Sequence, residues 1–93
     1  MPKYKVVAHR KVYKFLNELS DNSLKVAFKD HISKLEDYPL SLREMDTEVI
    51  RGVNNTFRLR VGGYRIIFFV DKSETIIYVT DIKARKKAYT KRT

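Results

Sequence analysis

Apolar residues along the first half of the chain follow a strand-like and then a helical pattern. The run YKVVAH at 4–9 predicts a short N-terminal strand. From Arg10 to Leu19, and again over 24–35, apolar residues recur at helical spacing. Between them SDNS at 20–23 offers N-cap side chains for the second helix, which Pro39 is expected to end. Two amphipathic helices joined by so short a turn are expected to form an antiparallel hairpin.

The second half of the chain has the pattern of strands. Residues 40–55 are weakly patterned and allow a short edge strand at 48–51. Gly-Gly and DKSE then separate three predicted strands, which are 56–61, 64–70 and 75–82. This order predicts an α+β fold in a single domain over 1–93. An N-terminal strand and a two-helix antiparallel hairpin pack on one face of a mainly antiparallel sheet, and 84–93 forms a basic tail.

The predicted hairpin TFRLRVGGYRIIFFV at 56–70 carries three arginines inside its strands. If its two glycines form a two-residue loop, Arg60 pairs with Arg65 across the strands. Strand alternation then places Arg58 on the same face as this pair. The other face, with residues such as Leu59, is apolar and is expected to carry the helices. The three arginines are therefore predicted to share one face of the sheet.

This predicted arginine cluster has no acidic residue within its own two strands. Like charges directly opposed across strands cost about 0.2 to 1 kcal/mol. Asp81 falls on the other face if the last strand alternates regularly. The pattern therefore favours a face that receives an anion such as a phosphate, which guanidinium groups bind well. The pattern is about equally consistent with arginines that simply extend into water.

Composition favours a polyanionic partner. The 93 residues have a net charge of +9, and the segment 51–93 holds eleven basic and three acidic residues, a net +8. Such an excess favours nucleic acid, an acidic protein or a membrane surface. No apolar run approaches the roughly 20 residues of a membrane span, so a cytoplasmic location is expected.

Metal and cofactor chemistry is not expected. The chain has no cysteine, and its two histidines are isolated from each other. His31 lies on the apolar stripe of the second helix and is expected to be packed and hydrogen-bonded. His9 ends the first strand and is expected to help cap the helix that follows.

The C-terminal run DIKARKKAYTKRT adds further basic residues. Because the strand 75–82 is expected at or near the centre of the sheet, Arg85 could join the arginine cluster. Tyr89 lies among cations and could stack on an exposed base. A solvated tail that binds polyanions loosely is the alternative. The candidate RNA-binding residues of this run are Lys83, Lys86, Lys87 and Lys91.

The segments VIRGVNNTFRLRVGGYRIIFFV at 49–70 and ARKKAY at 84–89 resemble the RelE toxins of the RelE/ParE superfamily, the toxic halves of prokaryotic toxin–antitoxin pairs. The resemblance implies a compact, microbial-ribonuclease-like α+β fold. It also implies a type II toxin that enters the ribosomal A site and cuts mRNA there. Its partners would be the ribosome and an acidic, RelB-like antitoxin that covers the arginine face in a hetero-oligomer.

The resemblance also implies roles for particular residues. Arg65 and Arg85 would stabilise the transition state, Arg58 and Arg60 would hold the phosphate and favour ionisation of the 2′-hydroxyl, and Tyr89 would position the base. Some relatives carry lysine at the positions of Arg58 and Arg60. A desolvated lysine can accept a proton, whereas arginine stays protonated, so the proton acceptor is left open. A ParE-like inhibitor of DNA gyrase and a non-catalytic RNA- or DNA-binding module are the alternatives.

Overall fold

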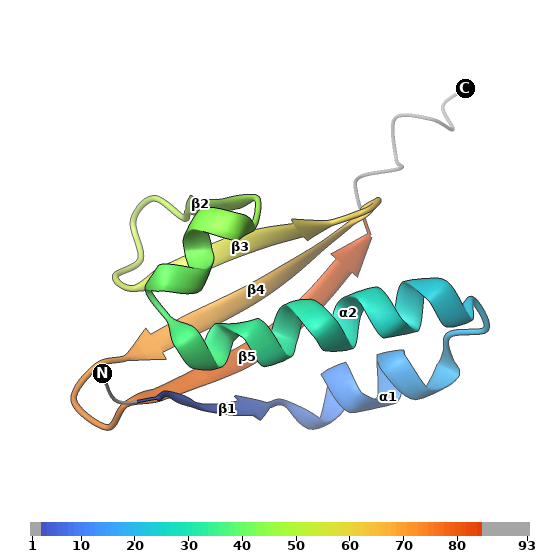
Figure 1. Ribbon diagram of the computed structural model, residues 1–93, viewed down its shortest axis with the longest axis horizontal. Helices are drawn as coiled ribbons and strands as arrows, with labels where there is room; N and C mark the ends of the chain where they lie inside the picture. The colour runs from blue at the N-terminus through green and yellow to red at the C-terminus, as the bar shows by residue number, and fades with distance from the viewer. Residues whose placement is uncertain (1–2, 85–93) are drawn as a thin grey trace.

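In the computed structural model, which describes residues 3–84, two helices pack on one face of a five-stranded mixed sheet (Figure 1). The strand order is β1-β5-β4-β3-β2, with β1 parallel to β5 and the other pairs antiparallel. The predicted α+β architecture is confirmed. The elements are β1 (Lys5–Ala8), α1 (Arg10–Glu18), α2 (Asn22–Lys34), the 3₁₀ turns η1 (Leu35–Asp37) and η2 (Leu40–Glu44), β2 (Thr47–Val49), β3 (Thr56–Val61), β4 (Tyr64–Asp71) and β5 (Ile76–Ala84).

Some predicted boundaries differ from the observed ones. The second helix ends at Lys34, because the fully buried Leu35 turns its N–H to the carbonyls of Ile32 and Ser33 and starts a 3₁₀ turn. The edge strand lies at 47–49 instead of 48–51. The last strand extends two residues beyond its predicted end, so the first residue of the predicted tail belongs to the sheet.

Both helices begin at side-chain caps. The His9 ring Nδ1 accepts a hydrogen bond of 3.0 Å from the Lys11 N–H at the start of α1. Asp21 Oδ1 accepts one of 3.1 Å from the Leu24 N–H at the start of α2. His31 Nδ1 lies 2.8 Å from the Ala27 carbonyl oxygen one turn earlier in α2. The two histidines therefore have the structural roles predicted for them.

Asp21→Ala removes the N-cap of α2 and is expected to lower the free energy of unfolding by about 1 kcal/mol. The loss arises because an amide at the helix start then has no side-chain acceptor. Urea denaturation followed by circular dichroism measures it. Glu18→Ala, at an exposed position at the end of α1, is the control and should stay within about 0.5 kcal/mol of wild type. Equal effects of the two changes would contradict the cap.

The face of the sheet under the helices forms the core. In β3 and β4 its residues are those that strand alternation placed there, and Leu59, Ile66 and Phe68 are completely buried. Phe28 of α2 is also completely buried and lies over this face, with its ring centroid 5.4 Å from that of Tyr64. Figure 1 shows α1 and α2 running in opposite directions on this side, as the predicted hairpin requires. Within the described part of the chain, no helix is long and apolar enough to cross a membrane.

Candidate functional site

The three arginines of the β3–β4 hairpin lie together on the face of the sheet opposite the helices. Arg60 pairs with Arg65, and Arg58 pairs with Ile67, as the two-glycine loop predicted. Gly62 allows this tight turn with φ of 61°, a conformation that favours glycine. We call this surface the arginine face and define it by Arg58, Arg60 and Arg65.

A β-bulge in β5 changes which of its residues lie on the arginine face. Ile67 pairs with Asp81, which leaves Thr80 as an extra residue in β5. Asp81 therefore lies on the arginine face, and the prediction that it lies on the helix-covered face is wrong. The physical reason is burial. The extra residue brings Ile82 against the core and keeps the Asp81 carboxylate out of it.

The bulge also places Lys83 on the arginine face. Lys83 pairs with Arg65, which pairs with Arg60, so three cations form one row across β3, β4 and β5. The sequence indicated Lys83 as part of an RNA-binding run but did not place it in this row. Adjacent like charges repel, and a bound anion would relieve the repulsion.

Two carboxylates next to β3 contact the arginines. Glu48 Oε1 lies 3.2 Å from Arg58 Nη2, and Asp46 Oδ2 lies 3.8 Å from Arg60 Nη1. No acid lies within the two hairpin strands, but the segment that precedes β3 brings two carboxylates to the arginines. Glu48 is brought there by the β2–β3 register, in which it lies directly opposite Arg58. Both ion pairs are partly exposed and contribute little to stability.

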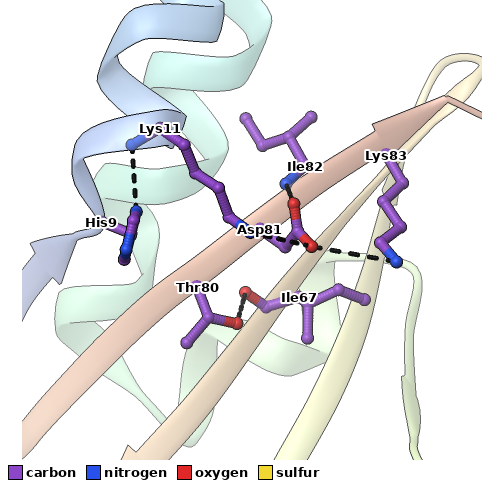
Figure 2. Close-up of polar contacts among 7 residues, drawn as sticks. All are labelled: His9, Lys11, Ile67, Thr80, Asp81, Ile82 and Lys83. Atoms are coloured by element: carbon purple, nitrogen blue, oxygen red, sulfur yellow. Dashed lines mark hydrogen bonds and ion pairs between the residues drawn. The ribbon is translucent and has the colours of Figure 1, made fainter.

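At the β5 side of the arginine face, the Asp81 carboxylate partly compensates the charges of two lysines. Figure 2 shows Lys11 of α1 and Lys83 of β5 directed at this carboxylate, with Nζ to Oδ2 distances of 3.6 and 3.8 Å. The Ile82 N–H donates to Asp81 Oδ1 at 3.0 Å (Figure 2). Arg65 forms no ion pair within residues 3–84. Of the three cations in the row, it is therefore the one whose charge is not already compensated there.

A hollow lies at the glycine end of the arginine face. Its volume is about 330 Å³, and it is lined by Asp46, Arg60, Gly62, Gly63, Tyr64 and Arg65. Two guanidinium groups against one carboxylate leave this hollow with a net positive charge. Planar guanidinium groups can each offer two N–H donors to a phosphate, so the hollow is suited to a phosphodiester.

The remaining predicted site residues lie outside the described part of the chain. They are Arg85, Lys86, Lys87, Tyr89 and Lys91. The last described residue, Ala84, pairs with Tyr64 at the hollow. The roles of the five residues stay predictions.

Among residues 3–84, a titratable group whose pKa is shifted lies away from the arginine face. Burial, and to a smaller extent the neighbouring Tyr4, raises the pKa of the Tyr38 hydroxyl. Tyr38 packs against Phe57 in the core on the helix side of the sheet, away from the arginines. Among residues 3–84 no three side chains of the kinds that bind metals come together.

Comparisons with known proteins identify the class to which this fold and face belong. The family model described as ParE toxin of the type II toxin–antitoxin system, parDE, matches residues 7–89. A protein of Methanocaldococcus jannaschii assigned as toxin RelE1 is 31% identical over 87 residues, which cover 94% of this chain and 96% of that protein. The chain belongs to the RelE/ParE family of toxins of type II toxin–antitoxin systems, and it is a RelE-type toxin.

Solved structures agree with this assignment. The archaeal RelE–RelB complex from Pyrococcus horikoshii contains a chain with a TM-score of 0.78 and 26% identity, over 91% of this chain and 98% of that one. The RelB–RelE complex from Methanococcus jannaschii gives 0.71 and 23%, over 94% and 99%. The isolated RelE toxin of E. coli gives 0.66 and 16%, over 94% and 92%, and shows the shared fold. The predicted RelE fold is confirmed.

Proposed function

We propose that this toxin is an endoribonuclease that cuts mRNA in the ribosomal A site and so stops translation. The observation that carries the proposal is the row of Arg60, Arg65 and Lys83 beside a positively charged hollow. A single-stranded RNA backbone presents phosphates to such a surface, and the cations would bind them in any sequence. The family to which the chain belongs is one of toxins, which supports a toxic role for the protein.

The proposed chemistry is attack of the RNA 2′-oxygen on the adjacent phosphorus. Negative charge then builds up on the phosphoryl oxygens, and preorganised donors that face this charge lower the barrier. Arg60 and Arg65 line the hollow and are assigned to this task, while Arg58 would hold a neighbouring part of the backbone. Arg85 is proposed to add a further cation and Tyr89 to stack on a base. The ribosome would supply the geometry of the RNA.

An acidic, RelB-like antitoxin is the proposed partner. The similar chains from Pyrococcus horikoshii and Methanococcus jannaschii are parts of RelE–RelB complexes. A net charge of +9 favours an acidic protein that covers the arginine face in a toxin–antitoxin hetero-oligomer. Because mRNA on ribosomes is the proposed substrate, the toxin would act in the cytoplasm.

Inhibition of DNA gyrase is the second candidate function, because the matching family model is named for ParE toxins. A gyrase inhibitor would not need the cationic row of β3, β4 and β5. A plain nucleic-acid-binding module would need positive charge but no geometry for cleavage.

A translating extract separates these functions. The full-length toxin and its Arg65→Ala variant are added separately, mRNA ends are mapped, and gyrase supercoiling is measured in parallel. The proposal expects new mRNA ends at ribosome-occupied codons with wild type, far fewer with the variant, and unchanged supercoiling. Loss of supercoiling without new ends would replace the proposal by gyrase inhibition. Binding of RNA without new ends would leave a non-catalytic module.

A further inference from the structure

The proposed cleavage requires a group that removes the 2′-hydroxyl proton, and the arginines cannot do this because they stay protonated. In the described part of the chain, three carboxylates contact an arginine of this face or the neighbouring Lys83. They are Asp46, Glu48 and Asp81. A carboxylate is an effective general base when it has a free oxygen within reach of the hydroxyl. The surroundings of the three groups differ enough to choose one of them.

Asp81 is already fully engaged. Its oxygens accept from the backbone N–H of Ile82 at 3.0 Å and contact the ammonium groups of Lys11 and Lys83. Only 27% of its side chain is exposed, and it does not line the hollow. A proton acceptor must be reachable by the substrate, so Asp81 is better suited to hold Lys83 in the cationic row.

Glu48 is held more closely by its arginine than Asp46 is. The Glu48–Arg58 contact is 3.2 Å, and the two residues face each other directly in the β2–β3 register. Glu48 lies opposite Arg58, outside the row of Arg60, Arg65 and Lys83, and does not line the hollow. This carboxylate is placed to orient Arg58.

Asp46 lines the hollow together with Arg60 and Arg65. Its contact with Arg60 is 3.8 Å, too long for a strong hydrogen bond, and 68% of its side chain is exposed. Its oxygens are therefore free to accept a proton. The Arg60 N–H donates to the Asp46 carbonyl oxygen at 2.9 Å and fixes the backbone that carries the carboxylate. Asp46 is thus an anchored carboxylate at the edge of the phosphate-binding hollow.

We propose that Asp46 is the general base of the cleavage reaction; the inference rests on the proposed ribonuclease function. The Asp46 carboxylate takes the proton from the 2′-hydroxyl as the 2′-oxygen forms a bond to phosphorus. The bond from phosphorus to the 5′-oxygen of the next nucleotide breaks, and that oxygen takes a proton from water. The products are a 2′,3′-cyclic phosphate and a 5′-hydroxyl end. Arg60 and Arg65 stabilise the negative charge on the phosphoryl oxygens, while Asp46 accepts the proton.

The test uses Asp46→Asn in the full-length toxin, with purified ribosomes that carry an mRNA in an open A site. Single-turnover rates are measured from about pH 6 to about pH 8.5, where aspartate as a class is ionised. Wild type should give a flat profile. The variant should be slower by at least about 10²-fold, and its rate should rise about tenfold per pH unit, because hydroxide replaces the carboxylate.

The pH profile can be assigned to Asp46 because of what surrounds it. The hollow also contains Arg60, Tyr64 and Arg65, and Glu48 lies two residues along the chain and contacts Arg58. Arginines and phenols as classes do not change ionisation state over this range. Glu48 is present in both proteins, so it contributes equally to the two profiles.

Two further variants and a binding measurement separate loss of the base from loss of folding or of binding. Asp46→Glu retains a carboxylate and should restore a flat profile with part of the rate. Glu74→Gln, in the exposed turn between β4 and β5, is the control and should match wild type. The variant Asp46→Asn should still bind an mRNA with a 2′-deoxy nucleotide at the mapped cut position.

Two results would overturn the role of Asp46. One is a wild-type rate in Asp46→Asn, and the other is a slow rate with a flat pH profile, which would mean that the residue only positions other groups. In both cases ribosome-dependent cleavage by wild type would still stand. If wild type itself makes no cut, the proposed function fails, and the assignment of a general base fails with it.

Discussion

Arg65→Ala is expected to lower the rate of mRNA cleavage on ribosomes by about 10²- to 10³-fold. Arg65 lines the hollow, lies between Arg60 and Lys83 in the cationic row, and forms no ion pair within residues 3–84. Its charge is therefore available to the phosphate, where charge builds up in the transition state. Single-turnover cleavage on ribosomes programmed with one mRNA measures the loss.

Two companion variants show whether the loss belongs to the site. Arg65→Lys keeps the charge but not the planar pair of donors, so it should recover only part of the rate. Arg51→Ala removes an exposed arginine from the turn between β2 and β3 and should cleave like wild type. Arg65→Ala should also unfold within about 0.5 kcal/mol of wild type, because it removes no ion pair of the described residues. Equal cleavage by Arg65→Ala and Arg51→Ala would contradict a role for Arg65.

Phe68→Ala is expected to lower the free energy of unfolding by about 3 to 5 kcal/mol. Phe68 is completely buried in β4, and its ring stacks on that of Phe57 with centroids 5.2 Å apart. The substitution leaves a cavity in the core, because neighbouring side chains relax into such a space only partly. The total stability of a domain of this size is about 5 to 15 kcal/mol, so the change removes a large fraction of it. Urea denaturation measures the loss.

Phe69→Ala is the matched control for the core prediction. Phe69 is the next residue of β4, lies on the opposite face of the sheet, and is only partly buried beside Tyr78. Its truncation should cost less than half as much as that of Phe68, because water already reaches the site. Equal losses would mean that the two faces of β4 do not differ as strand alternation and the structure indicate.

The sequence was sufficient to predict the hairpin and its faces. The two glycines set the loop, the loop set the pairing of Arg60 with Arg65, and alternation then placed Leu59 and Ile66 under the helices. These features depend on local chemistry and on a period of two, both of which are visible in a single segment. The helix hairpin followed in the same way from two helical stripes and the capping candidates of SDNS at 20–23, of which the structure uses Asp21.

The positions of the carboxylates at the site could not be predicted from the sequence, because they depend on contacts between distant segments. Asp46 and Glu48 come from a three-residue edge strand and its approach, too short for a periodic pattern. Their alternate spacing was the available signal, since residues two apart lie on one face of a strand. The bulge at Thr80 changes the face of Asp81, and no turn residue or glycine marks it in the sequence. The position of Asp46, the proposed proton acceptor, therefore had to come from the structure.

The proposed function requires that the toxin cut mRNA only on the ribosome. The most direct measurement incubates the purified full-length toxin with one mRNA, alone and bound to ribosomes with an open A site, and maps every new end. The account predicts cuts at the A-site codon with ribosomes, each with a 2′,3′-cyclic phosphate and a 5′-hydroxyl, and almost none on free mRNA. Equal cleavage of free mRNA, or no cleavage on the ribosome, would contradict it.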